Sequence, residues 1–105
     1  MKEKKVYFKV HSTGNEFGNR YVIAICDKDL IGKTIENKKF KLVISERFYK
    51  GEEMDANKVV AILKEAANVN IVGKLSIELA LKAGIITKDK IVKIKGVPHA
   101  QSTAF

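Results

Sequence analysis

The stretch NVNIVGKLSIELALKAG, residues 68–84, constrains the fold of this chain more than any other. Asparagines near residues 68–70 interrupt a helical pattern, and Gly84 suits the left-handed position that follows a helix. We therefore predict a junction of two helices here, in which Asn70 caps a second helix that runs to Ala83. Ile85 would be the apolar residue that completes this helix end.

The first helix of the pair is predicted from Ala56 to about Ala67. Asp55 can accept hydrogen bonds from the free N–H groups at the start of a helix. Apolar residues then recur at the spacing of one helix face, at Val59, Ile62, Leu63 and Ala66. One side of this helix would therefore be buried.

Two strands joined by a hairpin loop are predicted before the helices. KVYFKVH, residues 5–11, alternates between apolar and polar side chains, which predicts a strand with one buried face. That face would carry Val6, Phe8 and Val10. RYVIAIC, residues 20–26, is nearly all apolar, which is typical of a central strand covered on both sides. STGNEFGN, residues 12–19, would form the loop between them.

Two further strands are predicted, one before the helices and one after them. The third lies at about residues 40–45, and Phe40, Leu42 and Ile44 would share one of its faces. The fourth is IVKIK, residues 91–95, and Val92 and Ile94 would face inward.

Two segments are predicted to be loops. RFYKGEEM, residues 47–54, would be a loop that Phe48 and Tyr49 anchor against the core. GVPHAQSTAF, residues 96–105, would be a final loop whose last residues, 102–105, form a mobile tail.

The resulting element order is β-β-β-α-α-β in a single domain, residues 1–105. Strands followed by a helical pair predict an α+β fold of two layers. The expected architecture is a mainly antiparallel sheet of about four strands covered by two helices.

Composition limits the functional classes. The net charge is +8, which favours acidic partners such as RNA, although it can serve solubility alone. The part up to Glu53 holds 12 basic and 8 acidic residues and the rest holds 8 and 4, so each part carries +4. Lysine and glutamate richness is a compositional hint of a thermophile.

No membrane span or secretion signal is expected. The longest apolar runs fall well short of the roughly 18 residues that a spanning helix needs. The start, MKEKKVYF, lacks the apolar core of a signal peptide, so we expect a cytoplasmic protein. Cys26, the only cysteine, lies in an apolar run and is interpreted as a core residue.

One candidate site is a basic face of the sheet. Alternate strand positions would place polar residues there: Lys5, Tyr7, Lys9, His11, Lys41, Lys93 and Lys95. Lysine attracts phosphate, and a tyrosine ring can stack on a base. The alternative is a solvated face whose lysines protect edge strands.

A second candidate is the helix junction. Gly73 would let backbone N–H groups approach an anion, and Lys74 would add charge. The alternative is that Asn70 and Gly73 serve only as cap and close-packing residues.

Other candidates lie in the loops. His99 and Gln101 would project from the turn GVPHAQ, and Arg47 could bind phosphate unless it pairs with Glu46. Two histidines and one cysteine are too few for a zinc site, and no catalytic signature is present. We therefore expect no metal, no cofactor and no catalytic residues.

Four segments together resemble a known family. They are VIAICDKDLIGKT at 22–34, VISERFYKGE at 43–52, NIVGKLSIELALKAG at 70–84 and IVKIKGVPHAQ at 91–101. In this order the chain resembles the small archaeal family known as domain of unknown function 424. The resemblance implies an archaeal cytoplasmic protein, with RNA binding and a translation-linked role as expectations, and it transfers no catalytic residue.

The leading hypothesis is a non-enzymatic RNA-binding module. Phosphate contacts are expected from Lys9, Arg47, Lys74, Lys93 and Lys95, and polar contacts from Asn70, His99 and Gln101. The alternative is a subunit that docks on a larger protein partner through Phe48, Tyr49 or Phe105. A small enzyme that uses His99 with Glu46 or Arg47 ranks last.

Overall fold

The structure is a computed structural model, and it describes residues 4–15 and 18–103. Its centre is a six-stranded sheet in the order β5-β1-β2-β6-β8-β7. The strands are β1 (Lys5–Asn15), β2 (Gly18–Asp27), β5 (Glu52–Asp55), β6 (Val69–Val72), β7 (Val92–Ile94) and β8 (Val97–Ser102). All pairs are antiparallel except β2–β6, which is parallel.

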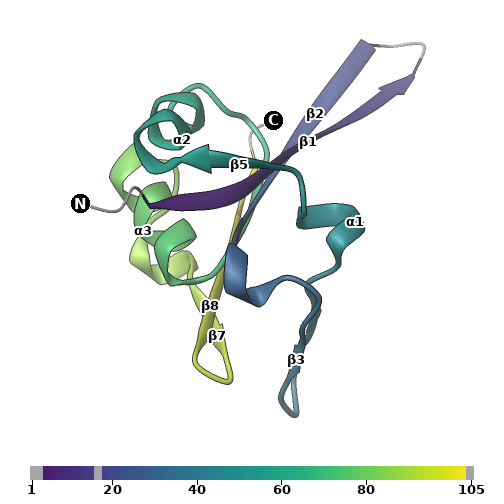
Figure 1. Cartoon of the computed structure of the whole chain (residues 1–105), viewed down its shortest axis with the longest axis vertical. Coiled ribbons are helices and arrows are strands. Elements are labelled where there is room, and N and C mark those ends of the chain that lie inside the picture. The colour runs from purple at the N-terminus through teal and green to yellow at the C-terminus, as the bar shows by residue number, and fades with distance from the viewer. Residues whose placement is uncertain (1–3, 16–17, 104–105) are drawn as a thin grey trace.

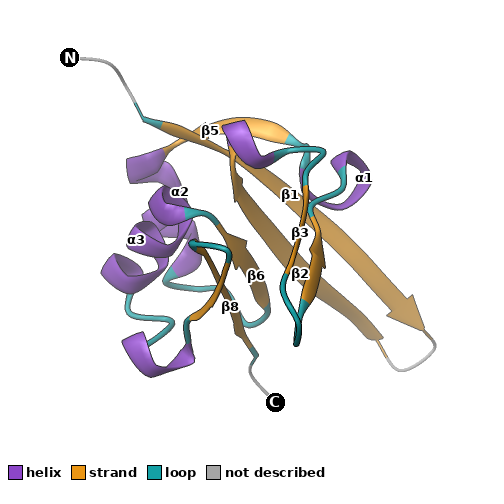
Figure 2. Ribbon diagram, turned by 90° about the horizontal axis from the view of Figure 1, so that it is seen from below, coloured by secondary structure: helices purple, strands orange, loops and turns teal. Residues whose placement is uncertain are grey.

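A second sheet and several helices surround the first. The small sheet consists of β3 (Thr34–Glu36) and β4 (Lys41–Val43). The α-helices are α1 (Glu46–Tyr49), α2 (Ala56–Leu63) and α3 (Lys74–Ala83), and the 3-10 turns are η1 (Lys28–Leu30) and η2 (Lys88–Lys90). Figure 2 shows α2 and α3 on one side of the large sheet, and α1 with β3 on the other.

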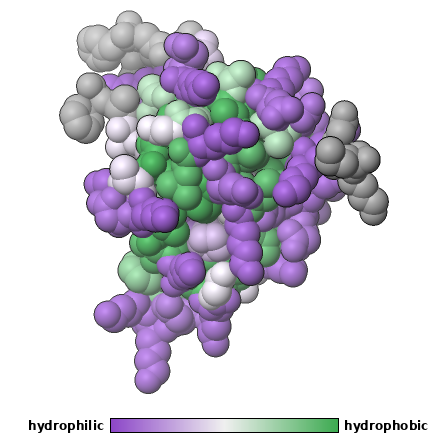
Figure 3. Space-filling view, turned by 90° about the vertical axis from the view of Figure 1, so that its left-hand side faces the viewer, coloured by the Kyte–Doolittle hydropathy of each residue, from purple (hydrophilic) through white to green (hydrophobic). Residues whose placement is uncertain are grey.

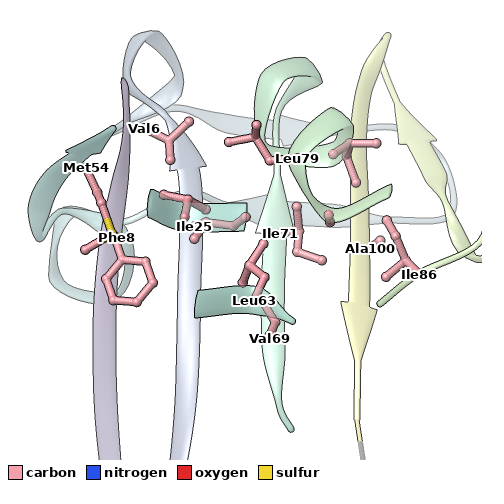
Figure 4. Packing of buried hydrophobic residues seen from close by; sticks show 13 residues of the cluster. Val6, Phe8, Ile25, Met54, Leu63, Val69, Ile71, Leu79, Ile86 and Ala100 are labelled. Carbon is pink, nitrogen blue, oxygen red and sulfur yellow. The ribbon is translucent and has the colours of Figure 1, made fainter. Parts of the chain in front are cut away.

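The main core lies between the large sheet and the α2–α3 pair. Four of its residues stand directly opposite one another across neighbouring strands: Phe8, Ile25, Ile71 and Ala100. Figure 4 shows this row pointing toward the residues of the helical layer. The predicted stripe of α2 is confirmed for Val59 and Leu63, both fully buried. The predicted end near Ala67 is wrong, because α2 ends at Leu63 and Ala66 lies beyond it.

A smaller core lies on the other face of the sheet. Ala24, Cys26 and Val72 are fully buried there against Leu30, Ile44 and Tyr49, which come from η1, the segment after β4, and α1. Strand β2 is therefore covered on both sides, as its apolar run predicts. The α+β class and the mostly antiparallel sheet are confirmed. The predicted four strands and two helices in the order β-β-β-α-α-β are wrong, because the described residues also form β3, β5, β6, β8 and α1. The small sheet and α1 add a layer on the second face of the large sheet.

The predicted helix junction is instead a strand followed by a helix. Val69, Ile71 and Val72 pair with β2 and β8 as β6, and Asn70 lies inside that strand and caps no helix. The β-branched residues fit a buried strand between two others.

The end of α3 is as predicted. Gly84 has a φ of 77° and its N–H donates to the carbonyl of Leu81, while the N–H of Ile85 donates to Ala80. Asp55 is likewise confirmed as the N-cap of α2, since its Oδ1 accepts from the Asn57 N–H at 3.3 Å.

Two predicted loops contain regular structure. Residues 47–54 include most of α1, which Ser45 caps, and the edge strand β5. Phe48 and Tyr49 do anchor this segment against the smaller core. The segment from Val97 to Ser102 is β8, an internal strand, so the predicted loop is wrong; residues 104–105 of the predicted tail lie outside the described residues.

Three strand predictions need correction on which side chains are buried. Phe40 precedes β4 and is 48% exposed, because β3 and β4 form their own sheet. Val10 is 49% exposed, because the β1–β2 hairpin continues beyond its neighbours β5 and β6. Figure 1 shows this hairpin projecting from the body; its tip, residues 16–17, lies outside the described residues. Val92 is 38% exposed on the edge strand β7.

Candidate functional site

Positive charge is concentrated at one end of the molecule. Residues 33–41 contain four lysines and one glutamate, and residues 88–95 contain four lysines and one aspartate. Each segment therefore carries +3, so together they hold six of the eight net charges. All eight lysines are exposed. Although each half of the sequence carries the same charge, folding brings these two segments together.

These segments form what we call the two-hairpin end, defined as residues 33–41 and 88–95. The β3–β4 hairpin and the β7–β8 turn point in the same direction in Figure 1. Residues of both segments line two shared cavities. In Figure 3, hydrophilic side chains cover the lower end of the molecule, toward which the β7–β8 turn points in Figure 1.

The tip of the β3–β4 hairpin presents an aromatic ring among lysines. Asn37 Oδ1 accepts hydrogen bonds from the N–H groups of Lys39 and Phe40, at 2.9 and 2.8 Å. The Asn37 N–H donates to the Phe40 carbonyl at 2.8 Å. These bonds fix a tight turn, so the backbone that carries the exposed ring of Phe40 has a defined conformation.

A tight turn also joins β7 to β8. Lys95 and Gly96 both have positive φ, at 52° and 80°, which is typical of a two-residue hairpin turn. Ile94 and Val97 pair on either side of it. The turn places Lys95 in the lining of two neighbouring cavities, which are described below.

The first cavity, of about 290 Å³, lies between the two hairpins. Its apolar walls include Phe40, Val92 and Ile94, and its polar groups are His99, Gln101 and Lys90. His99 and Gln101 share a sheet face with Val72 and Asn70, their direct partners in β6. Burial lowers the pKa of His99 below its usual value, so its ring is neutral at pH 7.

Two larger cavities, of about 390 Å³ each, adjoin one another near Lys95. One is lined by residues of the β3 side, including Lys33, Thr34 and Glu36. The other lies where the parallel strands β2 and β6 end, and Lys74, Gly73 and Asp27 line it. Both share Leu30, Lys95 and Val97.

The start of α3 already holds an anion, which is the protein's own carboxylate. Asp27 accepts hydrogen bonds from the N–H groups of Leu75 and Ser76, at 3.0 and 2.8 Å, and from Ser76 Oγ at 2.8 Å. Gly73 permits this approach, since a Cβ there would lie 2.2 Å from Asp27 Cγ. The N–H groups of Leu75 and Ser76 at this helix start are therefore engaged within the chain, as the packing alternative for Gly73 requires.

The predicted site residues divide between separate surfaces. Lys74, Lys95, His99 and Gln101 all line the cavities just described. Lys93 is exposed but lies on the opposite face of β7, because it pairs with Pro98 rather than with His99 or Val97.

The remaining predicted residues lie at α1 and in β6. Lys9 Nζ donates to the Arg47 carbonyl. His11 Nε2 lies 2.8 Å from the Phe48 carbonyl, and the two rings stack with centroids 4.5 Å apart. Lys9 and His11 of the predicted basic face therefore pack against α1. Asn70 is partly buried next to Gln101.

The aromatic anchors expected for a protein partner are used inside the fold. Tyr49 is only 4% exposed, and burial raises the pKa of its hydroxyl to about 12. Phe48 packs on the smaller core, and Phe105 lies outside the described residues. The enzyme hypothesis pairs His99 with Glu46 or Arg47. Neither residue lines the cavity that contains His99, because both lie on α1, which packs beside β1 and β2.

Sequence reasoning did not identify Phe40, the exposed aromatic residue of the two-hairpin end, as a candidate site residue. Phe40 was predicted to share a face with core residues, whereas it projects among Lys38, Lys39 and Lys41. The signal was the segment NKKFK itself, in which one aromatic residue interrupts a lysine run.

The fold defines a small basic α+β domain with a mixed six-stranded sheet and cavities at one end. No helix in the described part of the chain is long and apolar enough to cross a membrane. The chain belongs to the family described as Protein of unknown function (DUF424), whose model matches residues 16–105. The resemblance drawn from its sequence motifs is thereby confirmed.

A solved structure has a similar fold. It is the crystal structure of an uncharacterized conserved protein from Methanopyrus kandleri, with 30% sequence identity and a TM-score of 0.78. The match covers 96% of this chain and 95% of that one. No curated protein matches the chain.

Proposed function

We propose that the protein binds single-stranded RNA at the two-hairpin end. The observation that supports this most is the concentration of six of the eight net charges in two facing segments of the chain. A cluster of lysines attracts the phosphate backbone without regard to sequence. An exposed aromatic ring within the cluster provides the stacking surface that single-strand binders combine with a basic groove.

The proposed contact surface retains part of the residue set expected from sequence. Lys74 and Lys95, which line one of the adjoining cavities, remain in it, and lysines from residues 33–41 and 88–90 are added. Lys93 forms no part of it, because it lies on the opposite face of β7. Lys9 and Arg47 lie at α1 and form no part of it. His99 and Gln101 contribute polar groups within the cavity between the hairpins.

The test is a salt titration of binding to RNA and DNA oligonucleotides of equal length and sequence. Contacts with about five phosphates of a single strand predict a slope of log K against log salt of roughly −3.5. The triple variant Lys38→Gln, Lys39→Gln, Lys41→Gln should make the slope shallower by about 2, if each lysine contacts a phosphate.

A matched control removes the same charge elsewhere. Lys58, Lys64 and Lys82 are exposed, the first and last lying on α2 and α3 and the second at the end of α2. Replacing all three with glutamine also lowers the net charge from +8 to +5. Equal losses of affinity in both triple variants would refute a specific surface at the two-hairpin end. A separate experiment tests the translation-linked role: sequencing of the RNA that is crosslinked to the protein in cells.

A further inference from the structure

We infer that the cavity between the hairpins receives one unpaired nucleobase of the bound RNA. This inference rests on the proposed function and adds a recognition site to it. Phosphate binding by the lysines alone requires no cavity, whereas a cavity with apolar walls and polar groups suits a base.

The chemistry of the cavity matches that of a base. Phe40, Val92 and Ile94 supply apolar walls, and one of these is an aromatic ring that can stack. His99 and Gln101 supply hydrogen-bonding groups inside. A base has two apolar faces and a polar edge, so it can use both kinds of surface at once.

The hydrogen-bonding capacity is varied enough to read an edge. The Gln101 amide offers donors and an acceptor, and a neutral imidazole such as that of His99 offers one of each. Lys90 is exposed at the rim, where a phosphate attached to the base through the ribose would lie. The volume of about 290 Å³ lies just below the range of about 300–1,000 Å³ that is usual for ligand pockets, which suits a ligand as small as a single nucleotide unit.

The backbone that carries the stacking residue Phe40 is fixed before the ligand arrives. The N–H groups of Lys39 and Phe40 both donate hydrogen bonds to Asn37 Oδ1, and these bonds fix the backbone conformation of the turn. The opposite wall belongs to β7 and β8, which pair through Val92 and His99. Such preorganisation reduces the entropy lost on binding.

The experiment compares a base-bearing RNA decamer with an abasic ribose-phosphate oligomer of the same length. Both are titrated against the full chain and the variant Phe40→Ala. Tyr21→Ala is the control, since Tyr21 is 55% exposed on the β1–β2 hairpin and is likewise aromatic. Circular dichroism establishes that each variant is folded.

We expect Phe40→Ala to weaken binding of the base-bearing RNA by about 5- to 150-fold, the range found for loss of one stacked base. Binding of the abasic oligomer should not change, and Tyr21→Ala should affect neither ligand. In ¹H–¹⁵N spectra, adenosine or uridine 5′-monophosphate should shift the amide signals of His99 and Gln101, whereas ribose 5-phosphate should not.

The failures of the two proposals are distinguishable. If Phe40→Ala binds both oligomers as the parent does while the lysine triple variant loses affinity, the base site is refuted and the RNA-binding surface stands. An equal loss for both oligomers would also refute base recognition. If the parent protein binds no RNA even at low salt, both proposals fall.

Discussion

Replacing Gly73 with alanine should destabilise the protein more than the same change at Gly84, the glycine at the other end of α3. Gly73 has φ 108° and ψ 156°, a backbone region that is essentially restricted to glycine. A new Cβ would lie 2.2 Å from Asp27 Cγ and 2.5 Å from its Oδ1. The Asp27 side chain must therefore leave the start of α3.

The cost has two parts. The backbone strain of a non-glycine residue in this region is about 1–3 kcal/mol. Loss of the hydrogen bonds from Leu75 and Ser76 to Asp27 is comparable to loss of a helix cap, about 1 kcal/mol. We expect a total loss of about 2–4 kcal/mol from a free energy of unfolding that for typical domains is about 5–15 kcal/mol.

Urea unfolding followed by circular dichroism measures this loss. With an m-value of about 1–3 kcal/mol/M, the midpoint should fall by roughly 0.7–4 M. Gly84→Ala is the matched control, because Gly84 also has a positive φ but nothing lies within 4 Å of the Cβ that would be added. It should lose only the strain of a left-handed residue, about 1–2 kcal/mol. Equal losses in the two variants would refute the close approach of Asp27 to Gly73.

Three further outcomes are expected. Burial lowers the pKa of His99, so its neutral ring contributes fully to the free energy of unfolding above the unfolded pKa of about 6.5. This contribution decreases as the pH drops toward the pKa of His99 in the folded protein. His99→Gln should reduce this loss between pH 7.5 and 5.5, and an unchanged pH profile of urea midpoints would contradict it. Burial raises the pKa of Cys26 from 9.0 to about 12, so its thiolate fraction at pH 8 should be lower by roughly a thousandfold. Alkylation followed by mass spectrometry should therefore be slow until urea unfolds the chain, and rapid labelling of the folded protein would exclude this burial. Ile71→Ala should cost about 2–5 kcal/mol, because Ile71 is fully buried between Ile25 and Ala100; a midpoint close to that of the parent would show that the core collapses around the gap.

Strong local patterns allowed part of the fold to be predicted from sequence. The apolar stripe of α2, the cap at Asp55 and the glycine after α3 depend on neighbouring residues alone, and the structure has all three. The run around Ala24 and Ile25 correctly predicts a strand covered on both faces. Such features are encoded within a few residues.

The missed strands depend on tertiary contacts. Val69–Val72 is a short apolar run, and such a run fits a helix or a strand equally well until its neighbours are known. β8 contains proline, histidine and glutamine, which suggest a loop, but pairing with β6 and β7 makes it a strand. The Pro98 carbonyl accepts from the Gly73 N–H at 2.9 Å, a contact between distant segments that no local pattern reveals.

The candidate site was hidden for the same reason. Lys74, Lys95, His99 and Gln101 were identified individually, yet their common location follows from sheet order. The charges of residues 33–41 and 88–95 are separated in the sequence by nearly half of the chain. Only the packing of β3–β4 beside β7–β8 combines them into one surface.

The parallel pairing of β2 with β6 has a consequence for how the chain folds. Partners such as Ile25 and Ile71 are 46 positions apart, so forming this pair closes a long loop at an entropic cost of about 3 kcal/mol. The β3–β4 hairpin lies within that loop and takes no part in closing it. Substitutions at its tip should therefore have little effect on the folding rate, whereas changes at Ile25 or Ile71 should slow folding.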